Sequence, residues 1–107
     1  MAFTNAAWST PESNLSPEDY CKVCLIDENP QGQDKVKAMC HLPVRSTPDG
    51  SYNMNALRAA AAALGGARSP MKVKPASKRS AAKKLARLMR EAGIEPGQMT
   101  RRMAGQS

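Results

Sequence analysis

Residues 53–66 read Asn-Met-Asn-Ala-Leu-Arg-Ala-Ala-Ala-Ala-Ala-Leu-Gly-Gly, and this stretch decides the fold. Alanine and leucine have the most favourable helix propensities. Asparagine at the start of a helix accepts hydrogen bonds from free backbone N–H groups, and glycine commonly ends a helix. The stretch therefore predicts a helix from Asn53 or Asn55 to Leu64, with small side chains that let another part of the chain approach closely.

A second helix is predicted after a linker from Gly65 to Pro75; it begins near Ser77 or Ser80 and ends at Gly93. Apolar residues recur there at intervals of one, three or four, which places them on one side of a helix. They are Ala81, Ala82, Leu85, Leu88, Met89 and Ala92. Basic residues fill the remaining face: Lys78, Arg79, Lys83, Lys84, Arg87 and Arg90. The segment is an amphipathic basic helix, about 24 Å long at 1.5 Å per residue.

Two short apolar segments precede the alanine-rich helix. The run Val23 to Ile26 is followed by the turn-rich residues 27–32 and indicates a buried strand. The segment from Ala38 to Val44 contains Pro43, which lacks the N–H donor that a central strand needs, so we expect an edge strand paired with the first. Residues 48–50, Pro-Asp-Gly, then turn the chain.

A short helix is predicted from Pro17 to about Lys22, because Ser16 is a favourable N-cap and proline suits the first helical position. The four elements together predict a small single α+β domain: a short N-terminal helix, a two-stranded hairpin-like element, an alanine-rich helix and a C-terminal basic amphipathic helix. We expect this module to span residues 14–94. An extended N-terminal arm over 1–13 and a flexible basic tail over 95–107 should flank it.

The chain has 107 residues and few large rings, so its core should be thin and aliphatic. The aromatic residues are Phe3, Trp8, Tyr20 and Tyr52. No apolar run approaches the roughly 18 residues of a transmembrane helix, and residues 1–8 lack the basic and apolar regions of a signal peptide. We therefore expect neither kind of segment, and synthesis in the cytoplasm.

Charge is divided unevenly along the chain. The first 57 residues carry a formal charge of −3 and the last 50 carry +10, which gives the net charge of +7. A basic half attracts acidic partners through long-range attraction and counterion release. Nucleic acid, an acidic protein surface and an anionic membrane all fit this charge, and a solvated helix face is the ordinary explanation of a charge run.

The composition of the basic helix bears on each of these partners. Its polar face has no aromatic residue and no asparagine or glutamine, which limits base stacking and adenine readout, so DNA contact would be mainly to phosphates. Its alanine-rich apolar side lacks the Phe or Trp that anchors an interfacial helix, so we expect no membrane partner. The six basic residues of this helix are the candidate contacts for an acidic partner or DNA.

Three cysteines and one histidine allow a metal site without requiring one. Cys21 and Cys24 form a C-x2-C pair, and Cys40-His41 follows after fifteen residues, a separation compatible with a zinc finger or ribbon. However, the first pair encloses no glycine, and adjacent residues of a strand point to opposite sides. Buried reduced thiols, which pack as small hydrophobes, fit better. We predict neither a metal nor another cofactor.

The sequence contains no motif of a catalytic site. It has no G-x-S-x-G, no phosphate-binding G-x-x-x-x-G-K-[ST] and no H-E-x-x-H. The adjacent carboxylates Asp27-Glu28 and Glu18-Asp19 lie in a predicted turn and a first helical turn, where capping and solubility account for them. We predict that the protein is not an enzyme and has no small-molecule substrate.

The order of several segments resembles a small module of tailed-phage head genes, found alone or appended to prohead maturation proteases and other capsid-associated proteins. The resemblance extends from Trp8 to Ile94 and includes the basic helix as its last element. It is carried by Trp8, Ser16 to Tyr20, Cys24 to Asp27, Cys40 to Val44, Asp49-Gly50, Asn55 to Leu57 and Ala59 to Gly66.

The resemblance implies a virion component that lies on or in the capsid shell. We expect this chain to hold the module without the protease. Cys24 and Cys40 match the pattern, whereas Cys21 and His41 do not look like its regular members. The resemblance thus implies that Cys24 pairs with Cys40, as packed thiols or as a disulfide formed after lysis, and it counts against a four-ligand zinc site.

The resemblance implies a minor capsid, decoration or head-assembly protein of a double-stranded DNA phage. Its partner would be the major capsid protein, and packaged DNA is a further candidate if the chain faces inward. The expected location is the virion, on either face of the capsid. The alternative is a non-sequence-specific nucleic-acid-binding protein, with or without a structural zinc.

Overall fold

The alanine-rich stretch forms helix α2, Met54–Leu64, in the computed structural model, which describes residues 2–65 and 73–94. Asn53 is its N-cap, and the Asn53 side-chain oxygen accepts a hydrogen bond from the Ala56 backbone N–H at 3.0 Å. The helix buries one side, made of Ala56, Leu57, Ala60 and Leu64. The sequence therefore predicted both ends of α2.

Helix α3, Pro75–Glu91, is the predicted basic helix, and it begins two residues before the earlier of the two predicted starts. Lys74 is the N-cap and its side chain makes no capping bond; the Glu28 carboxylate caps the first turn instead. The helix ends where Gly93 adopts a φ of +78°, a conformation that favours glycine. The cap that Glu28 supplies from a distant part of the sequence explains why α3 begins earlier than predicted.

Helix α1, Pro17–Val23, leads directly into strand β2, Cys24–Asp27. The Ser16 hydroxyl caps α1 by accepting a hydrogen bond from the Asp19 backbone N–H at 3.2 Å. Strand β2 pairs antiparallel with β3, Cys40–Pro43, so the predicted hairpin-like element is confirmed. A single 3-10 turn, Lys37–Met39, precedes β3.

Residues at the N-terminus return to the domain. Strand β1, Phe3–Thr4, pairs in parallel with β4, Tyr52–Asn53, and a 3-10 turn spans Glu12–Asn14. The Asn53 and Asn55 side-chain amides donate hydrogen bonds to the Ala6 carbonyl, at 3.1 and 2.9 Å. Residues 1–13 were expected to form an extended arm beside the module, and part of this arm contacts β4 and the start of α2.

Arg45 ties the turn before β4 to α1. Its guanidinium lies over the Tyr52 ring, 4.8 Å from the ring centroid. It also donates hydrogen bonds to the Pro48 carbonyl at 2.7 Å and to the Lys22 carbonyl at 3.3 Å. One partly buried side chain thus holds three segments together.

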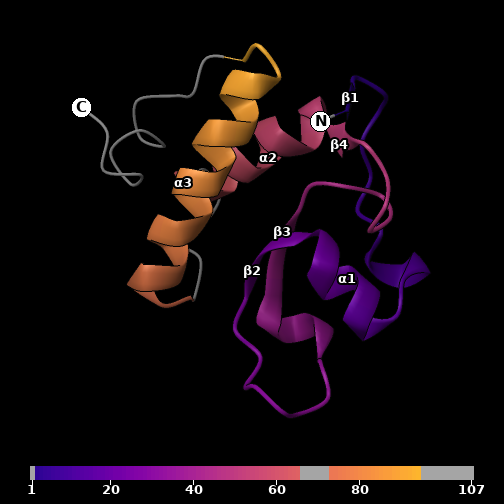
Figure 1. Cartoon of the computed structure of the whole chain (residues 1–107), viewed down its shortest axis with the longest axis vertical. Coiled ribbons are helices and arrows are strands. Elements are labelled where there is room, and N and C mark those ends of the chain that lie inside the picture. Colours follow the sequence, from indigo (N-terminus) through magenta and orange to yellow (C-terminus); the bar gives the residue numbers. More distant parts are fainter. Residues whose placement is uncertain (1, 66–72, 95–107) are drawn as a thin grey trace.

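The core is aliphatic, as the scarcity of aromatic residues predicts. Its main cluster lies between α2, α3 and the β2–β3 pair, and α3 crosses α2 (Figure 1). The largest fully buried side chains are Leu57, Leu85, Leu88, Val23 and Val44. A second cluster joins α1 to the hairpin through Tyr20, Cys21, Val23, Cys24 and Cys40. The described residues form one small α+β domain.

Two predicted segments lie outside the described residues: most of the 65–75 linker and the 95–107 tail. Within the described part of the chain, no helix combines the length and the apolar character that crossing a membrane requires.

Candidate functional site: a basic helix face and a disulfide loop

Five of the six predicted contact residues share the exposed side of α3. Arg79, Lys83, Lys84, Arg87 and Arg90 are all exposed, whereas the opposite side of the helix is buried in the core. At 100° per residue they occupy an arc of about 140°. We call these five residues the basic face; it runs about 16 Å along the helix at 1.5 Å per residue.

Lys78 stands apart from the basic face. It lies four residues before Ala82 and seven before Leu85, which places it on the side of α3 that packs against the core. Its side chain is accordingly half-buried. The sequence assigned Lys78 to the polar face because it is charged, and helical spacing places it at the edge of the apolar side instead.

The basic face makes no ion pair within the described residues, although the exposed carboxylate Glu91 lies on the same side of α3, four residues after Arg87. The ion pairs there join Lys22 to Asp19 and Lys35 to Asp27, and neither involves α3. Like charges on one helix face repel one another, so an acidic ligand that approaches this side relieves the repulsion as well as adding attraction. The face can therefore bind phosphates or carboxylates.

Glu28 fixes the start of α3 and hence the direction of the basic face. One of its carboxylate oxygens accepts hydrogen bonds from the Lys74 backbone N–H at 3.0 Å and from the Ser77 hydroxyl at 2.8 Å. These bonds, the first of them foremost, hold the pKa of the Glu28 carboxyl below its ordinary value. The sequence places Glu28 in a predicted turn and carries no signal for this capping role.

The second feature is a disulfide between Cys21 on α1 and Cys40 at the start of β3. The pairing of Cys24 with Cys40 that the resemblance implied is wrong. The reason is the strand register: Pro43 lies opposite Cys24, and Asp27 lies opposite Cys40. Because α1 ends before Cys24, the Cys21 side chain reaches β3 from the helix, and Cys24 remains a buried free thiol.

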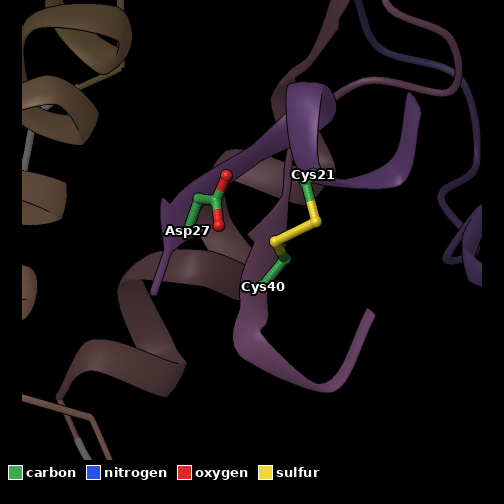
Figure 2. A group of neighbouring side chains, drawn as sticks. All are labelled: Cys21, Asp27 and Cys40. Atoms are coloured by element: carbon green, nitrogen blue, oxygen red, sulfur yellow. A yellow bond between two sulfur atoms is a disulfide. The ribbon is translucent and has the colours of Figure 1, made fainter. Parts of the chain in front are cut away.

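The register also brings the Asp27 carboxylate beside the disulfide (Figure 2). The two sulfur atoms and a carboxylate oxygen of Asp27 all lie within 4.8 Å of one another. Both sulfur atoms are buried, whereas Asp27 is exposed. This trio, Cys21, Asp27 and Cys40, differs from the four ligands considered in the sequence, because the structure brings neither Cys24 nor His41 to it.

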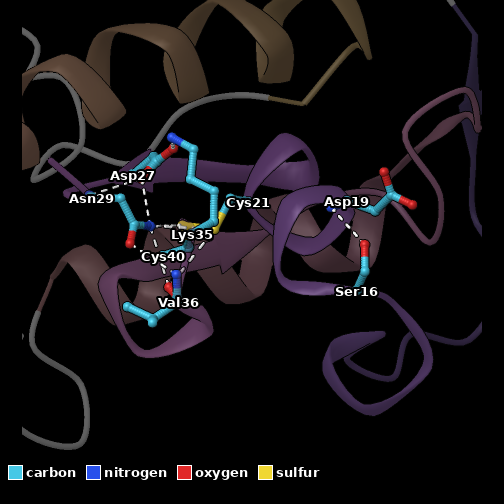
Figure 3. The surroundings of a disulfide bond; sticks show 8 residues. All are labelled: Ser16, Asp19, Cys21, Asp27, Asn29, Lys35, Val36 and Cys40. Carbon is cyan, nitrogen blue, oxygen red and sulfur yellow. Dashed lines mark hydrogen bonds and ion pairs between the residues drawn. A yellow bond between two sulfur atoms is a disulfide. The ribbon is translucent and has the colours of Figure 1, made fainter. Parts of the chain in front are cut away.

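Asn29 closes the loop over the disulfide (Figure 3). Its side-chain oxygen accepts a hydrogen bond from the Val36 backbone N–H at 2.9 Å, and its Nδ2 donates to the Asp27 carboxylate at 2.9 Å. Partial burial raises the pKa of the Asp27 carboxyl, but hydrogen bonds from Lys35 and Asn29 outweigh it and keep that pKa below its ordinary value. Asp27 is thus held as a carboxylate.

The remaining thiol is chemically quiet. Burial in the core is the main reason why the pKa of the Cys24 thiol is raised to about 12. The thiolate is the nucleophile and the metal ligand, so a thiol that stays protonated near neutral pH does neither reaction well. Cys24 therefore serves as a small apolar core residue, as predicted for all three cysteines, whereas that prediction is wrong for Cys21 and Cys40, which form the disulfide.

Comparison with known proteins adds no relative to this description. No family model, no curated protein and no solved structure matches the chain.

Proposed function

We propose that this protein is a structural component of a tailed-phage head that binds an acidic surface of the major capsid shell through the basic face of α3. The observation that carries the proposal is the five exposed cations on one side of a helix whose other side is locked in the core. The sequence resemblance supplies the capsid as the partner.

The way α3 is held supports a docking role. Its apolar side packs on α2 and β2, and Glu28 fixes its first turn, so the five cations are presented on a rigid support. A ligand that binds a rigid face does not pay to order the backbone that carries it. The face is therefore suited to a protein surface with acidic groups at fixed positions.

The same face favours one second candidate, a phosphate-backbone binder that acts on DNA without reading its sequence. Each phosphate neutralised on duplex DNA contributes about −0.9 to the slope of log K against log salt, so five contacts give a slope of about −4.5. An acidic protein surface lacks the condensed counterions of DNA, and its salt dependence should be shallower.

The test is co-sedimentation of the purified protein with DNA-free capsid shells and, separately, with duplex DNA over a range of salt concentrations. The proposal expects saturable binding to shells at a salt concentration where binding to DNA is lost. Binding to DNA with the steep slope, and none to shells, would favour the second candidate.

A pair of charge-matched variants connects the result to α3. Replacing Lys83 and Arg87 with glutamine removes two charges from the basic face, whereas replacing Lys22 and Arg58 with glutamine removes two exposed charges elsewhere. The first variant should bind shells at least tenfold more weakly and the second should bind like the natural chain. Equal losses in both would show that net charge alone is responsible, and would contradict docking by α3.

A further inference from the structure

We propose that Cys21, Cys40 and Asp27 form a binding site for a thiophilic divalent cation of the Zn²⁺ class when the disulfide is reduced. The site would alternate between two states: a disulfide without metal, and two thiolates with a bound cation. It is separate from the basic face, and it differs from the Cys21, Cys24, Cys40 and His41 set considered in the sequence.

The possible ligand atoms of Cys21, Cys40 and Asp27 converge in the structure. The Cys21 and Cys40 sulfurs and an Asp27 oxygen lie within 4.8 Å of one another. Zinc binds sulfur at about 2.3 Å and carboxylate oxygen at 2.0–2.2 Å in a tetrahedron, so its ligand atoms stand roughly 3.3–3.8 Å apart. After reduction the two sulfurs, which are bonded to each other in the disulfide, would move apart to this spacing and the Asp27 oxygen would approach them, and the fourth position would remain for water or a carbonyl.

The side-chain nitrogen of Asn29 contacts more hydrogen-bond acceptors than it has hydrogens to donate. It lies 2.9 Å from an Asp27 oxygen and 3.2 Å from the Val36 carbonyl oxygen. It also lies 3.3 Å from the Cys40 sulfur and 3.6 Å from the Cys21 sulfur. Four electron-pair donors thus surround one NH₂ group, which has two hydrogens to offer. A cation in place of this NH₂ could satisfy all of them, once the Asn29 side chain turns outward.

A divalent cation and Lys35 together balance the charge of the reduced site. Two thiolates and the Asp27 carboxylate carry three negative charges in one small region. A divalent cation supplies two positive charges, and Lys35, whose Nζ already pairs with Asp27, supplies the third. Without the cation, two thiolates beside a carboxylate repel one another, which favours protonated thiols or the disulfide. The reduced trio is therefore a site that gains from binding a cation.

A dithiol can reduce the Cys21–Cys40 disulfide and so open the site to a cation. A dithiol transfers two electrons and two protons to the Cys21–Cys40 disulfide and becomes a disulfide itself, leaving two protein thiols. The cation then binds both sulfurs and displaces the two thiol protons to solvent. Oxidation of the site by a small-molecule disulfide reverses these steps and releases the cation.

The test is a titration with Co²⁺, which gives an intense thiolate-to-metal absorption band when two sulfurs bind it. The full chain is reduced anaerobically with a phosphine, which does not itself offer thiols, and is titrated beside a sample left oxidised. We expect one equivalent bound to the reduced chain, none to the oxidised chain, and displacement by one equivalent of Zn²⁺. No band in the reduced chain would overturn the proposal.

Four variants locate the site. Asp27→Asn should weaken Co²⁺ binding at least tenfold, whereas Asp34→Asn, an exposed carboxylate of the same loop, should not change it. Cys24→Ser should leave both the band and the affinity unchanged. Asn29→Asp should strengthen binding at least tenfold, because it replaces an NH₂ donor with an oxygen ligand. Loss of the band in Cys24→Ser, or equal affinity in Asp27→Asn, would contradict the assignment.

Circular dichroism in the far ultraviolet shows whether reduction of the disulfide unfolds α1 and the loop between β2 and β3. If the reduced chain loses helix signal, one equivalent of Zn²⁺ should restore it in the natural chain and in Asp34→Asn, and much less in Asp27→Asn. Failure of Zn²⁺ to restore the signal in the natural chain would count against the site.

Discussion

The Ser77 hydroxyl donates a hydrogen bond to the Glu28 carboxylate at 2.8 Å, although 49 positions separate the two residues in the chain. The same oxygen accepts the Lys74 backbone N–H at 3.0 Å. The hairpin therefore supplies the cap that α3 lacks. This contact sets where α3 begins and which way its charged side faces.

Replacing Glu28 with glutamine should loosen the first turn of α3, because the charged acceptor at its N-terminus is lost. Amide hydrogen exchange should increase at Lys74 and over residues 76–79 and remain unchanged in α2. Glu18→Gln is the matched control, since Glu18 is an exposed carboxylate in the first turn of another helix. Unchanged exchange at the start of α3 would show that the cap contributes nothing.

The same contact predicts a dependence on pH. Its two hydrogen bonds keep the pKa of Glu28 below its ordinary value, so the folded chain releases this proton more readily than the unfolded chain. The stabilisation is present above the unfolded pKa and is lost as pH falls through the folded one. Thermal unfolding between pH 6 and pH 3 should show a smaller decline in Glu28→Gln than in the natural chain. Equal declines in both would contradict this contribution.

The disulfide connectivity can be read from one digest, because trypsin separates the three cysteines. Cleavage after Lys22, Lys35, Lys37 and Arg45 places Cys21 in residues 1–22, Cys24 in residues 23–35 and Cys40 in residues 38–45. Mass spectrometry of the oxidised chain, alkylated before digestion, should find residues 1–22 linked to residues 38–45. A link between residues 23–35 and 38–45 would support the Cys24 pairing instead.

Reduction of this disulfide should destabilise the chain by roughly 3 kcal/mol, the value that loop-closure entropy gives for a loop of this size. Chemical denaturation of the oxidised and reduced chains in metal-free buffer measures the difference. Cys21→Ser and Cys40→Ser should each show the same loss without a reductant. A stability that reduction does not change would mean that the crosslink is not formed in the folded chain.

Cys24 should resist alkylation in the folded protein. Its pKa of about 12 keeps it a neutral thiol at pH 8, and its side chain is buried. Iodoacetamide should label it after unfolding and not before. Because the folded pKa exceeds the unfolded one, its contribution to stability is lost as pH rises from about 9 towards 12. Rapid labelling at pH 8 would show that the cluster around Cys24 opens readily.

Leu85 tests whether the packing of α3 maintains the fold. It is fully buried between the helices and the hairpin, so Leu85→Ala should cost about 2–5 kcal/mol. Val36, an exposed apolar residue, is the control, and Val36→Ala should change stability far less. Urea denaturation followed by circular dichroism measures both. A small loss in Leu85→Ala would place α3 outside the cooperative core.

The helices were predictable because their signals are local. Asn53 and the alanine run define α2, and Ser16-Pro17 define the start of α1. The pairing of β1 with β4 was not predictable, because two-residue strands carry no periodicity and their stability depends on partners almost fifty positions away. The carboxylate that caps α3 is distant in the same way.

The cysteine pairing shows the same division. The spacing between Cys21 and Cys24 allowed both to bind one metal ion, and the resemblance implied that Cys24 pairs with Cys40. The helix ends at Val23, and the extended backbone of β2 turns Cys24 away, so its position was decided by one element boundary. The basic face, in contrast, followed from helical spacing, and Lys78 was assigned to it wrongly because its charge was given more weight than its spacing.

Quantitative mass spectrometry of purified virions shows whether this chain is a structural part of a phage head. We expect the chain to be present at a constant ratio to the major capsid protein. It should remain in particles carrying glutamine at a control pair of positions, Lys22 and Arg58, and be depleted in those carrying glutamine at Lys83 and Arg87. Absence of the natural chain from virions would contradict the account.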